Sequence, residues 1–458
     1  MVLFTFNGDT FNLTGGMSAS LSSSSDLEEG MSDFMSGLSH LMSDITGGLS
    51  HLSSALEGIN QTPSSLNDSA QYMPPSNLEA GHPDPSDGIV HRRVGSENWS
   101  EYHDRPSWAT KYRYGAETSF ELDVESADLF LVSRGLWHSG GIDVVQSKNV
   151  GEKVGVNVKV GYQYKEALAV ASVCLLERRE GGNGVGIFTS MRGHGTYRDH
   201  KDTLKFKVTV TLPAGKDGRP LKIKKFTTKT SLFSYKVGDF LNSVLFEEIS
   251  VQTLSGIIEV GHVTAKNGSF QSRNGSISGK FKTSNVLKLT TLSGRINVDA
   301  DLFCRENAGV PKLEVKSCNG PIHASVALES STGRGGAFKV STETFNGSLS
   351  LVVRDSPASS HLVCTARTMN GTANVQMHPA FEGQFQVRTT NARPALELHK
   401  RTLVAESVHR GRRRVVDELT QTRNLLTGNV YWSEDGTSRR RGGFVGVTTM
   451  NHQAKLTV

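Results

Sequence analysis

The sequence predicts an all-β protein in which strand-turn-strand repeats stack as a β-solenoid, or β-helix-like, structure. Three observations lead to this fold class. One strand-turn-strand pattern recurs along residues 246–458, its inward and outward positions keep the same phase across each turn, and glycine is abundant at 47 residues. Before the stack we expect a β-rich leading or cap domain at 117–245 and a disordered arm at 1–110.

The repeat is clearest in LKLTTLSGRINVDADL, residues 287–302, where two short strands flank Ser293 and Gly294. LEVKSCNGPIHASVAL, FKVSTETFNGSLSLVV and FQVRTTNARPALELHK read almost the same way. We take the second turn residue of each unit as its reference position. The references are Gly256, Gly275, Gly294, Gly320, Gly347, Gly371, Ala392 and His452, separated by 19, 19, 26, 27, 24, 21 and 60 residues.

Side chains seven, five and three positions before each reference, and two, four and six after it, are apolar or small. Strand side chains alternate between faces with period two, so a slip of one residue would turn this apolar set outward. We therefore expect Leu289, Val315 and Val340 to share one dry interior. The residue before the reference is usually Asn, which together with Gly tolerates the positive φ angles of tight turns.

Two architectures fit this pattern. Variable linker lengths around a constant turn favour a solenoid of stacked coils, whereas Asn-Gly turns on local grounds favour a row of hairpins forming a sandwich. Residues 117–245 also alternate, in KVGVNVKV, LKFKVTVTL and LKIKKF, but in a different register. They read as a leading domain or as irregular first coils, which would cap the exposed strand edges of the stack.

The predicted arm differs in composition from the rest of the chain. Residues 1–90 contain eleven acidic residues and no Lys or Arg, and 18 of the 90 are Ser, so they cannot bury enough apolar surface to order themselves. Within residues 26–60 an amphipathic helix is expected, because Met and Leu follow heptad spacing from Met31 to Ile59. Four glycines weaken that helix. We expect it to form on a partner, to self-associate through residues 31–59, or to remain a linker.

The stretches TLSGIIEV, SRNGSISGKFKTSNVLKLTTLSGRINV and KSCNGPIHASVAL resemble the adhesin-like repeats of a protein family of unknown function. Over residues 117–458 the chain is similar to uncharacterised fungal proteins, through GGNGVGIFT, HPAFEGQFQVRTTNARPALEL and GNVYW. The resemblance implies a β-repeat fold and assigns no catalytic residue.

The search for catalytic, cofactor-binding and metal-binding residues predicts none. GSISGK at 275–280 is one residue too short for a phosphate loop and reads as a repeat turn, and GGNGVGIF reads as a cluster of turns. His194, Asp199, His200 and Asp202 match no familiar metal-ligand spacing. A serine-hydrolase elbow is absent from the sequence.

A solenoid could still be a glycan-cleaving enzyme if carboxylates from neighbouring coils met on an outer face. The outward columns three and five positions after the reference place no two acids on consecutive units. Another outward column is largely apolar, and is either covered by another layer or a docking surface. It comprises Leu254, Arg273, Leu292, Cys318, Phe345, Met369, Thr390 and Met450.

These observations predict a non-enzymatic, adhesin-like interaction or scaffold protein whose partner is a protein or a glycan. A first alternative is a binder of nucleic acid or anionic lipid, through Arg410, Arg412–Arg414 and Arg439–Arg441. A second is a carbohydrate-active β-helix enzyme. With four scattered cysteines, no evident signal peptide and no apolar run long enough to cross a membrane, we expect a cytoplasmic protein with reduced thiols.

Overall fold

The structure is a computed structural model of the chain. It describes residues 3–6, 9–12, 81–95, 98–102, 108–136, 138–190, 203–306, 309–399, 413–433 and 442–458. Strands β1 (Leu3–Phe6) and β2 (Asp9–Asn12) form an antiparallel pair in a unit of their own, with Leu3 opposite Asn12. The expected helix at 26–60 lies outside the described residues.

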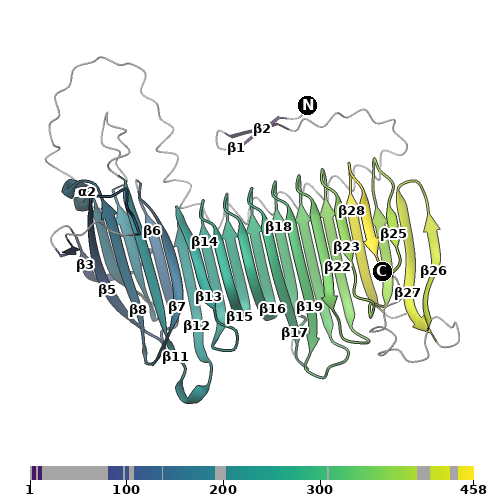
Figure 1. Cartoon of the computed structure of the whole chain (residues 1–458), viewed down its shortest axis with the longest axis horizontal. Coiled ribbons are helices and arrows are strands. Elements are labelled where there is room, and N and C mark those ends of the chain that lie inside the picture. Colours follow the sequence, from purple (N-terminus) through teal and green to yellow (C-terminus); the bar gives the residue numbers. More distant parts are fainter. Residues whose placement is uncertain are drawn as a thin grey trace. The chain divides into compact units, whose positions relative to one another are not determined.

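The remaining described strands form two long sheets that share one core, and Figure 1 shows these strands standing side by side in a row. Sheet I contains, in spatial order, β3 (Ile89–Val94), β9 (Ala171–Arg178), β10 (Gly182–Thr189), β6 (Asp128–Arg134), β12 (Leu221–Thr230), β14 (Val244–Thr253), the second halves of β15 (Ile258–Ser272) and β16 (Ile277–Thr291), β18 (Lys312–Ser317), β20 (Ala337–Thr344), β22 (His361–Thr368), β28 (Gly443–Thr449), β24 (Gly383–Arg388), β27 (Leu425–Ser433) and β26 (Arg413–Gln421).

Sheet II contains, in the same direction, β4 (Ser100–Tyr102), β5 (Tyr114–Asp123), β8 (Lys153–Tyr162), β11 (Leu204–Ala214), β7 (His138–Val150), β13 (Phe233–Asp239), the first halves of β15 and β16, β17 (Ile296–Cys304), β19 (Ile322–Ser330), β21 (Leu349–Asp355), β23 (Ala373–Gln376), β29 (Ala454–Thr457) and β25 (Ala395–Glu397). A short helix α2 (Lys165–Ala169) and a 3₁₀ turn at Lys216–Gly218 complete the described elements.

Each repeat unit places its first strand in sheet I and its second strand in sheet II. The two strands of a unit therefore do not pair with each other. Each pairs in parallel with its counterpart in a neighbouring unit, as Leu289 of β16 does with Val315 of β18. The solenoid prediction is confirmed and the hairpin alternative is wrong.

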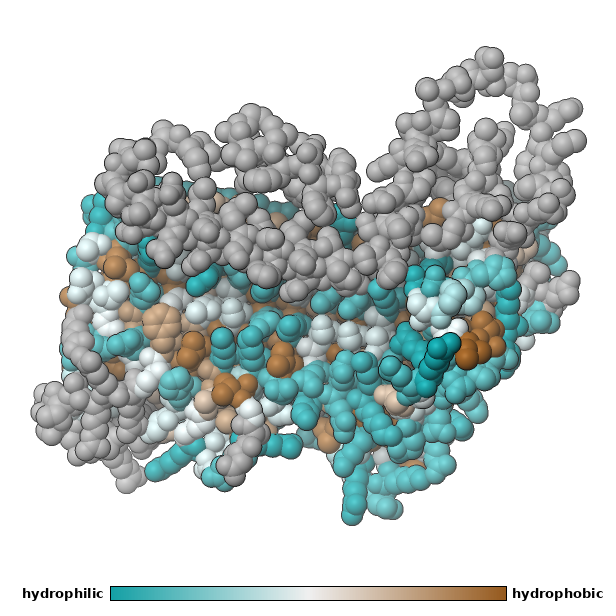
Figure 2. Space-filling model, turned by 180° about the vertical axis from the view of Figure 1, so that it is seen from behind, coloured by the Kyte–Doolittle hydropathy of each residue, from teal (hydrophilic) through white to brown (hydrophobic). Residues whose placement is uncertain are grey.

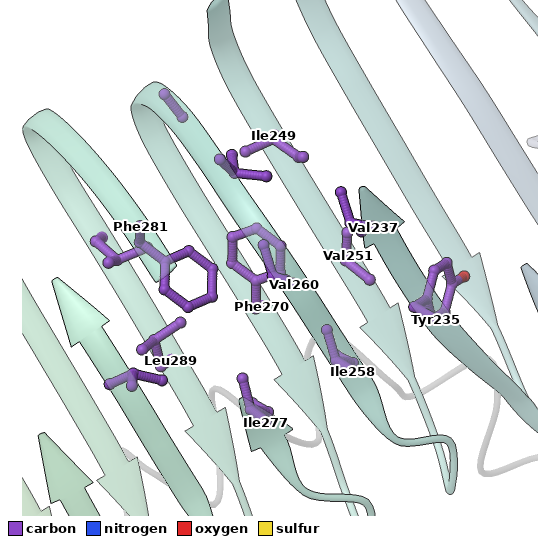
Figure 3. Packing of buried hydrophobic residues seen from close by; sticks show 14 of the residues in the cluster. Tyr235, Val237, Ile249, Val251, Ile258, Val260, Phe270, Ile277, Phe281 and Leu289 are labelled. Atoms are coloured by element: carbon purple, nitrogen blue, oxygen red, sulfur yellow. The ribbon is translucent and has the colours of Figure 1, made fainter. Parts of the chain in front are cut away.

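Side chains that point between the sheets form one continuous core, as the alternating pattern predicts. Leu289, Val315 and Val340 are each fully buried in it. Figure 3 shows how successive coils pack there, with the rings of Phe270 and Phe281 edge to face and their centroids 4.9 Å apart. Because one coil alone would leave its inward face wet, each coil depends on its neighbours for burial.

The glycines at the reference position are required by close packing between coils. None of the six has a positive φ, so the predicted reason for them is wrong. A Cβ atom added to Gly294 would lie 2.0 Å from the carbonyl oxygen of Gly275, and one added to Gly320 would lie 1.8 Å from that of Gly294. Glycine stands in this column because the next turn passes where a side chain would be.

An inward hydroxyl three residues before each of the six glycines accepts the glycine N–H, and five of these hydroxyls also donate to the turn of the preceding coil. In one coil the Gly347 N–H donates to Thr344 Oγ1 at 3.2 Å, and that hydroxyl donates to the Gly320 carbonyl at 3.0 Å. Ser272 repeats the arrangement between Gly275 and Gly256. This explains why Ser or Thr occupies an otherwise apolar inward row.

The asparagines before the glycines form a ladder along the outside of the turns. Asn346 Nδ2 donates to Asn319 Oδ1, and Asn370 Nδ2 donates to Asn346 Oδ1, both at 2.7 Å. Asn451 then donates to Asn370, and Asn391 donates to Asn451 over 2.7 Å. Stacked amides of this kind satisfy one another only where coils are in register, so the ladder records the order of the coils.

The order of the last coils differs from the order of the sequence. The coil of His452 lies between those of Gly371 and Ala392, because β28 pairs with both β22 and β24, and β29 pairs with both β23 and β25. The spacing of 60 residues before His452 therefore reflects a chain that passes this position, forms β24 to β27, and returns to fill it. In Figure 1 the yellow β28 stands beside the green β22, a strand from a much earlier part of the chain.

Residues of the predicted leading domain extend the same two sheets. Here too the coils are out of sequence order, since β10 and β11 lie outside β6 and β7. Strands β3 and β4, inside the predicted arm of residues 1–110, pair antiparallel with β9 and β5. They are held there because Val94 and Trp99 are buried against the core.

Substituting Gly294 by Ala should destabilise the protein by roughly 3 kcal/mol or more, because the added methyl group overlaps a backbone oxygen that cannot move without separating two coils. Gly141→Ala is the matched control, since nothing lies within 4 Å of its Cβ position. Denaturant unfolding of both variants measures the difference. Equal stabilities for the two variants would contradict the close-packing explanation.

Removing residues 443–458 should leave a gap one strand wide in each sheet, and a synthetic peptide of those residues should fill it. We expect the truncated chain to show faster amide hydrogen exchange in β22 and β24, and the peptide to restore protection. A peptide carrying Val445→Asp and Val447→Asp is the control, because both valines are fully buried. Unchanged exchange after truncation would argue against the inserted coil.

Candidate binding surfaces

The sequence stretches considered as phosphate-binding or metal-binding sites form turns and strands wherever the structure describes them. Residues 275–280 run from a turn into β16, where Gly279 adopts a φ of 142° and its Cβ position lies 2.1 Å from the Val260 carbonyl oxygen. No helix follows to bind a phosphate. His194, Asp199, His200 and Asp202 lie outside the described residues. Among the described residues, no group of three or more His, Cys, Asp or Glu side chains could hold a metal ion.

The glycine-rich stretch at 181–189 forms strand β10, so the prediction that it is a cluster of turns is wrong. Its glycines leave room on the outer side of sheet I for aromatic rings. A Cβ added to Gly184 would lie 2.4 Å from the Phe130 ring, and one added to Gly186 would lie 2.3 Å from the Phe188 ring. With Cys174 these rings form a small second core.

The four cysteines are free thiols in the structure. Burial raises the pKa of Cys318 to about 11 and that of Cys364 to about 12, and it also raises the pKa of Cys174. Because the thiolate is the reactive form, these residues are poor nucleophiles at neutral pH.

Several outward carboxylates of sheet II form ion pairs with cations from nearby coils. Asp299 and Asp301, two positions apart on β17, both form ion pairs with Arg354, whose distance to Asp299 is 3.8 Å. Lys282 pairs with Glu329 at 2.6 Å, and Lys455 pairs with Glu397 at 2.7 Å. The inserted coil supplies Lys455, a contact that a sequential stack would not contain.

The apolar column beside the turns is not an exposed surface. Leu254, Leu292 and Phe345 are buried, with 2%, 5% and 6% of their surfaces exposed. The other members, Arg273, Cys318, Met369, Thr390 and Met450, are half-buried. On the face of the molecule in Figure 2, described apolar side chains are scattered among polar ones and form no continuous band.

The basic cluster predicted around residue 413 does not form a solvated patch where it is described. Arg414 lies against the Trp432 ring and donates to the Pro379 carbonyl oxygen. Burial lowers the pKa of Arg414 to about 10, although the charge of Glu382 opposes this shift. Arg410, Arg412 and Arg439–Arg441 lie outside the described residues, as does the side chain of Arg413.

The outer side of sheet I carries several cations that the sequence did not lead us to predict. The outward positions considered there were those after the turn and the one two residues before the reference. Four of these cations are Lys316 on β18, Lys339 on β20, Arg367 on β22 and Arg388 on β24. The columns four and eight positions before the reference contain them, so the repeat register itself could have shown them.

One buried ionisable group stands out in the core. His138 packs against both the Phe206 and the Phe233 ring, with centroids 6.1 and 5.7 Å away. Its Nδ1 lies 2.8 Å from Thr189 Oγ1, a hydroxyl that donates to the Leu136 carbonyl, so Nδ1–H is the donor. Among the described residues Nε2 has no partner. Burial lowers the pKa of His138 to about 4, against a smaller raising effect from the Leu136 backbone.

The comparisons with known proteins leave the chain unassigned. No protein-family model and no curated protein matches it. A crystal structure described as that of a "putative cell adhesion protein" from Clostridium sporogenes aligns with 75% of this chain and 98% of its own, at 9% identity and a TM-score of 0.15. At those values the likeness carries no argument about function. Among the described residues there is no helix with the length and apolar character needed to cross a membrane.

His138 should make the stability of the protein depend on pH. Its pKa in the folded state, about 4, lies below the unfolded value of 6.5, so the unfolded chain takes up the proton first as pH falls. The contribution of His138 to stability is fully present above pH 6.5 and is lost as the pH falls towards 4. Between pH 7 and pH 4.5, His138 should lower the free energy of unfolding by about 2.5 kcal/mol.

The measurement is urea unfolding at both pH values, with His138→Gln compared with the wild type. The exposed His361→Gln is the control. The His138 variant should lose less stability on acidification than either of the others. A pH dependence that is identical in all three proteins would show that the buried imidazole is not responsible.

Proposed function

We propose that the chain is a non-enzymatic interaction protein of the adhesin-like kind, which binds a protein or glycan partner on the outer faces of its stack. The observation that carries this proposal is the constant outward register. Each coil presents polar side chains in straight rows, as in the row Glu259, Ser278, Asn297, His323 and Ser350 across five neighbouring strands. Such rows suit recognition of an extended partner at many weak contacts.

The state of the outward carboxylates supports binding over catalysis. Glycan cleavage needs one acid that is protonated and one that is free to act as base or nucleophile. Asp299 and Asp301 share the same arginine, and Glu329 and Glu397 are each paired with a lysine. The resemblance of residues 117–458 to proteins with adhesin-like repeats points in the same direction.

The full chain should bind at least one component of a combined glycan and protein array with saturable affinity and no turnover. Ligands found on the array are then titrated by calorimetry, and glycans are incubated with the protein and assayed for new reducing ends. Failure to bind any component would contradict the proposal. Turnover that is abolished by Asp299→Asn or Asp301→Asn, but retained by the distant Asp217→Asn, would establish the enzyme alternative instead.

A further inference from the structure

The outer side of sheet I between β16 and β24 carries a marked excess of positive charge. On its described strands the outward cations are six, against the two carboxylates of Glu314 and Glu343. We call this surface the basic face, and its cations are Lys288, Lys312, Lys316, Lys339, Arg367 and Arg388.

The strand register aligns three of these cations in one row. Lys316 lies opposite Glu343, which lies opposite Arg367. Arg367 and Arg388 both lie opposite Thr448 of the inserted strand. With strands about 4.8 Å apart, the three cations follow one another at intervals of about 10 Å along the stack.

The cations of this row form no salt bridge with the described carboxylates, although Glu343 lies in register between Lys316 and Arg367. Glu314 is occupied by Lys288 and Lys312. Its half burial raises the pKa of its carboxyl, but hydrogen bonding and charge from Lys312, together with the charges of Lys288 and Lys316, outweigh that effect and lower it. Within the described residues, Lys316, Lys339, Arg367, Arg388 and Glu343 form no ion pair of the usual length. By contrast, Asp299, Asp301, Glu329 and Glu397 of sheet II are each paired with a cation.

We propose that the basic face binds a linear acidic polysaccharide that lies along the stack and crosses its strands. Charge complementarity selects an anion, and cations spaced in a row across several strands select a polymer over a small molecule. The proposal deepens the proposed function, since it names a partner class for one face of the same interaction protein.

The spacing of the cations on the basic face fits an acidic polysaccharide better than a nucleic acid. Duplex DNA carries one charge per about 1.7 Å of its axis, far denser than one cation per about 10 Å, and it would also meet Glu343 between Lys316 and Arg367. Single strands are normally held by stacked aromatic rings, and on the described strands β16 to β24 of this face the aromatic side chain is Phe444. An extended polyuronate whose successive sugars face opposite sides presents every second carboxylate to the basic face, so it can span the glutamate.

The test compares Lys316→Gln/Arg367→Gln/Arg388→Gln with Lys236→Gln/Lys280→Gln/Arg295→Gln, which removes the same charge from sheet II and from the turn that leads into β17. All six side chains point outward, so both variants should fold, as circular dichroism and thermal melting will verify. The probe is a polyuronate oligosaccharide, with its neutral methyl ester for comparison, titrated at several salt concentrations. The first variant should bind the polyuronate at least tenfold more weakly and with a shallower salt dependence, while the control binds normally.

Equal losses in both variants, or none in either, would overturn the inference. Tighter binding of duplex DNA or of vesicles containing anionic lipid through the same three residues would overturn the choice of partner. An array ligand whose binding is unaffected by the first variant would leave the proposed function in place while removing this site. Binding of the polyuronate through these three residues, with no array component bound, would keep this site and contradict the proposed function.

Discussion

The fold depends on the close approach of successive turns at the reference position. A hydroxyl from one coil bonds to the glycine carbonyl of the coil before it, and the next glycine leaves no side chain in the way. This contact fixes the register of each new coil on the last. Because side chains alternate along a strand, a fixed register also decides which residues face the core and which face solvent.

The coils that lack this glycine show how the contact is adapted. At Ala392 and His452 the hydroxyls of Thr389 and Thr449 donate to the carbonyl of their own turn, not to that of a neighbouring coil. These are the coils whose order is rearranged by the inserted strand. The asparagine ladder nevertheless continues through both, so Asn451 and Asn391 maintain the register there.

The fixed register also decides which charged side chains lie next to one another on the two outer faces. On sheet II the register brings Arg354 beside Asp299 and Asp301, and the inserted coil brings Lys455 beside Glu397. On sheet I the same register places Lys316, Arg367 and Arg388 in one row, with Glu343 between the first two. Two faces built from one repeat therefore differ in electrostatics.

The sequence by itself determined the all-β class, the solenoid register and the buried positions such as Leu289 and Val315, because period-two alternation and turn spacing are local properties. Only the tertiary structure decided that the coil of His452 precedes that of Ala392, and that GGNGVGIF is a strand. Coils with the same inward pattern are interchangeable neighbours, so their order depends on which open edge the returning chain meets. Glycines that admit a ring from another strand look, in sequence, like glycines of a turn.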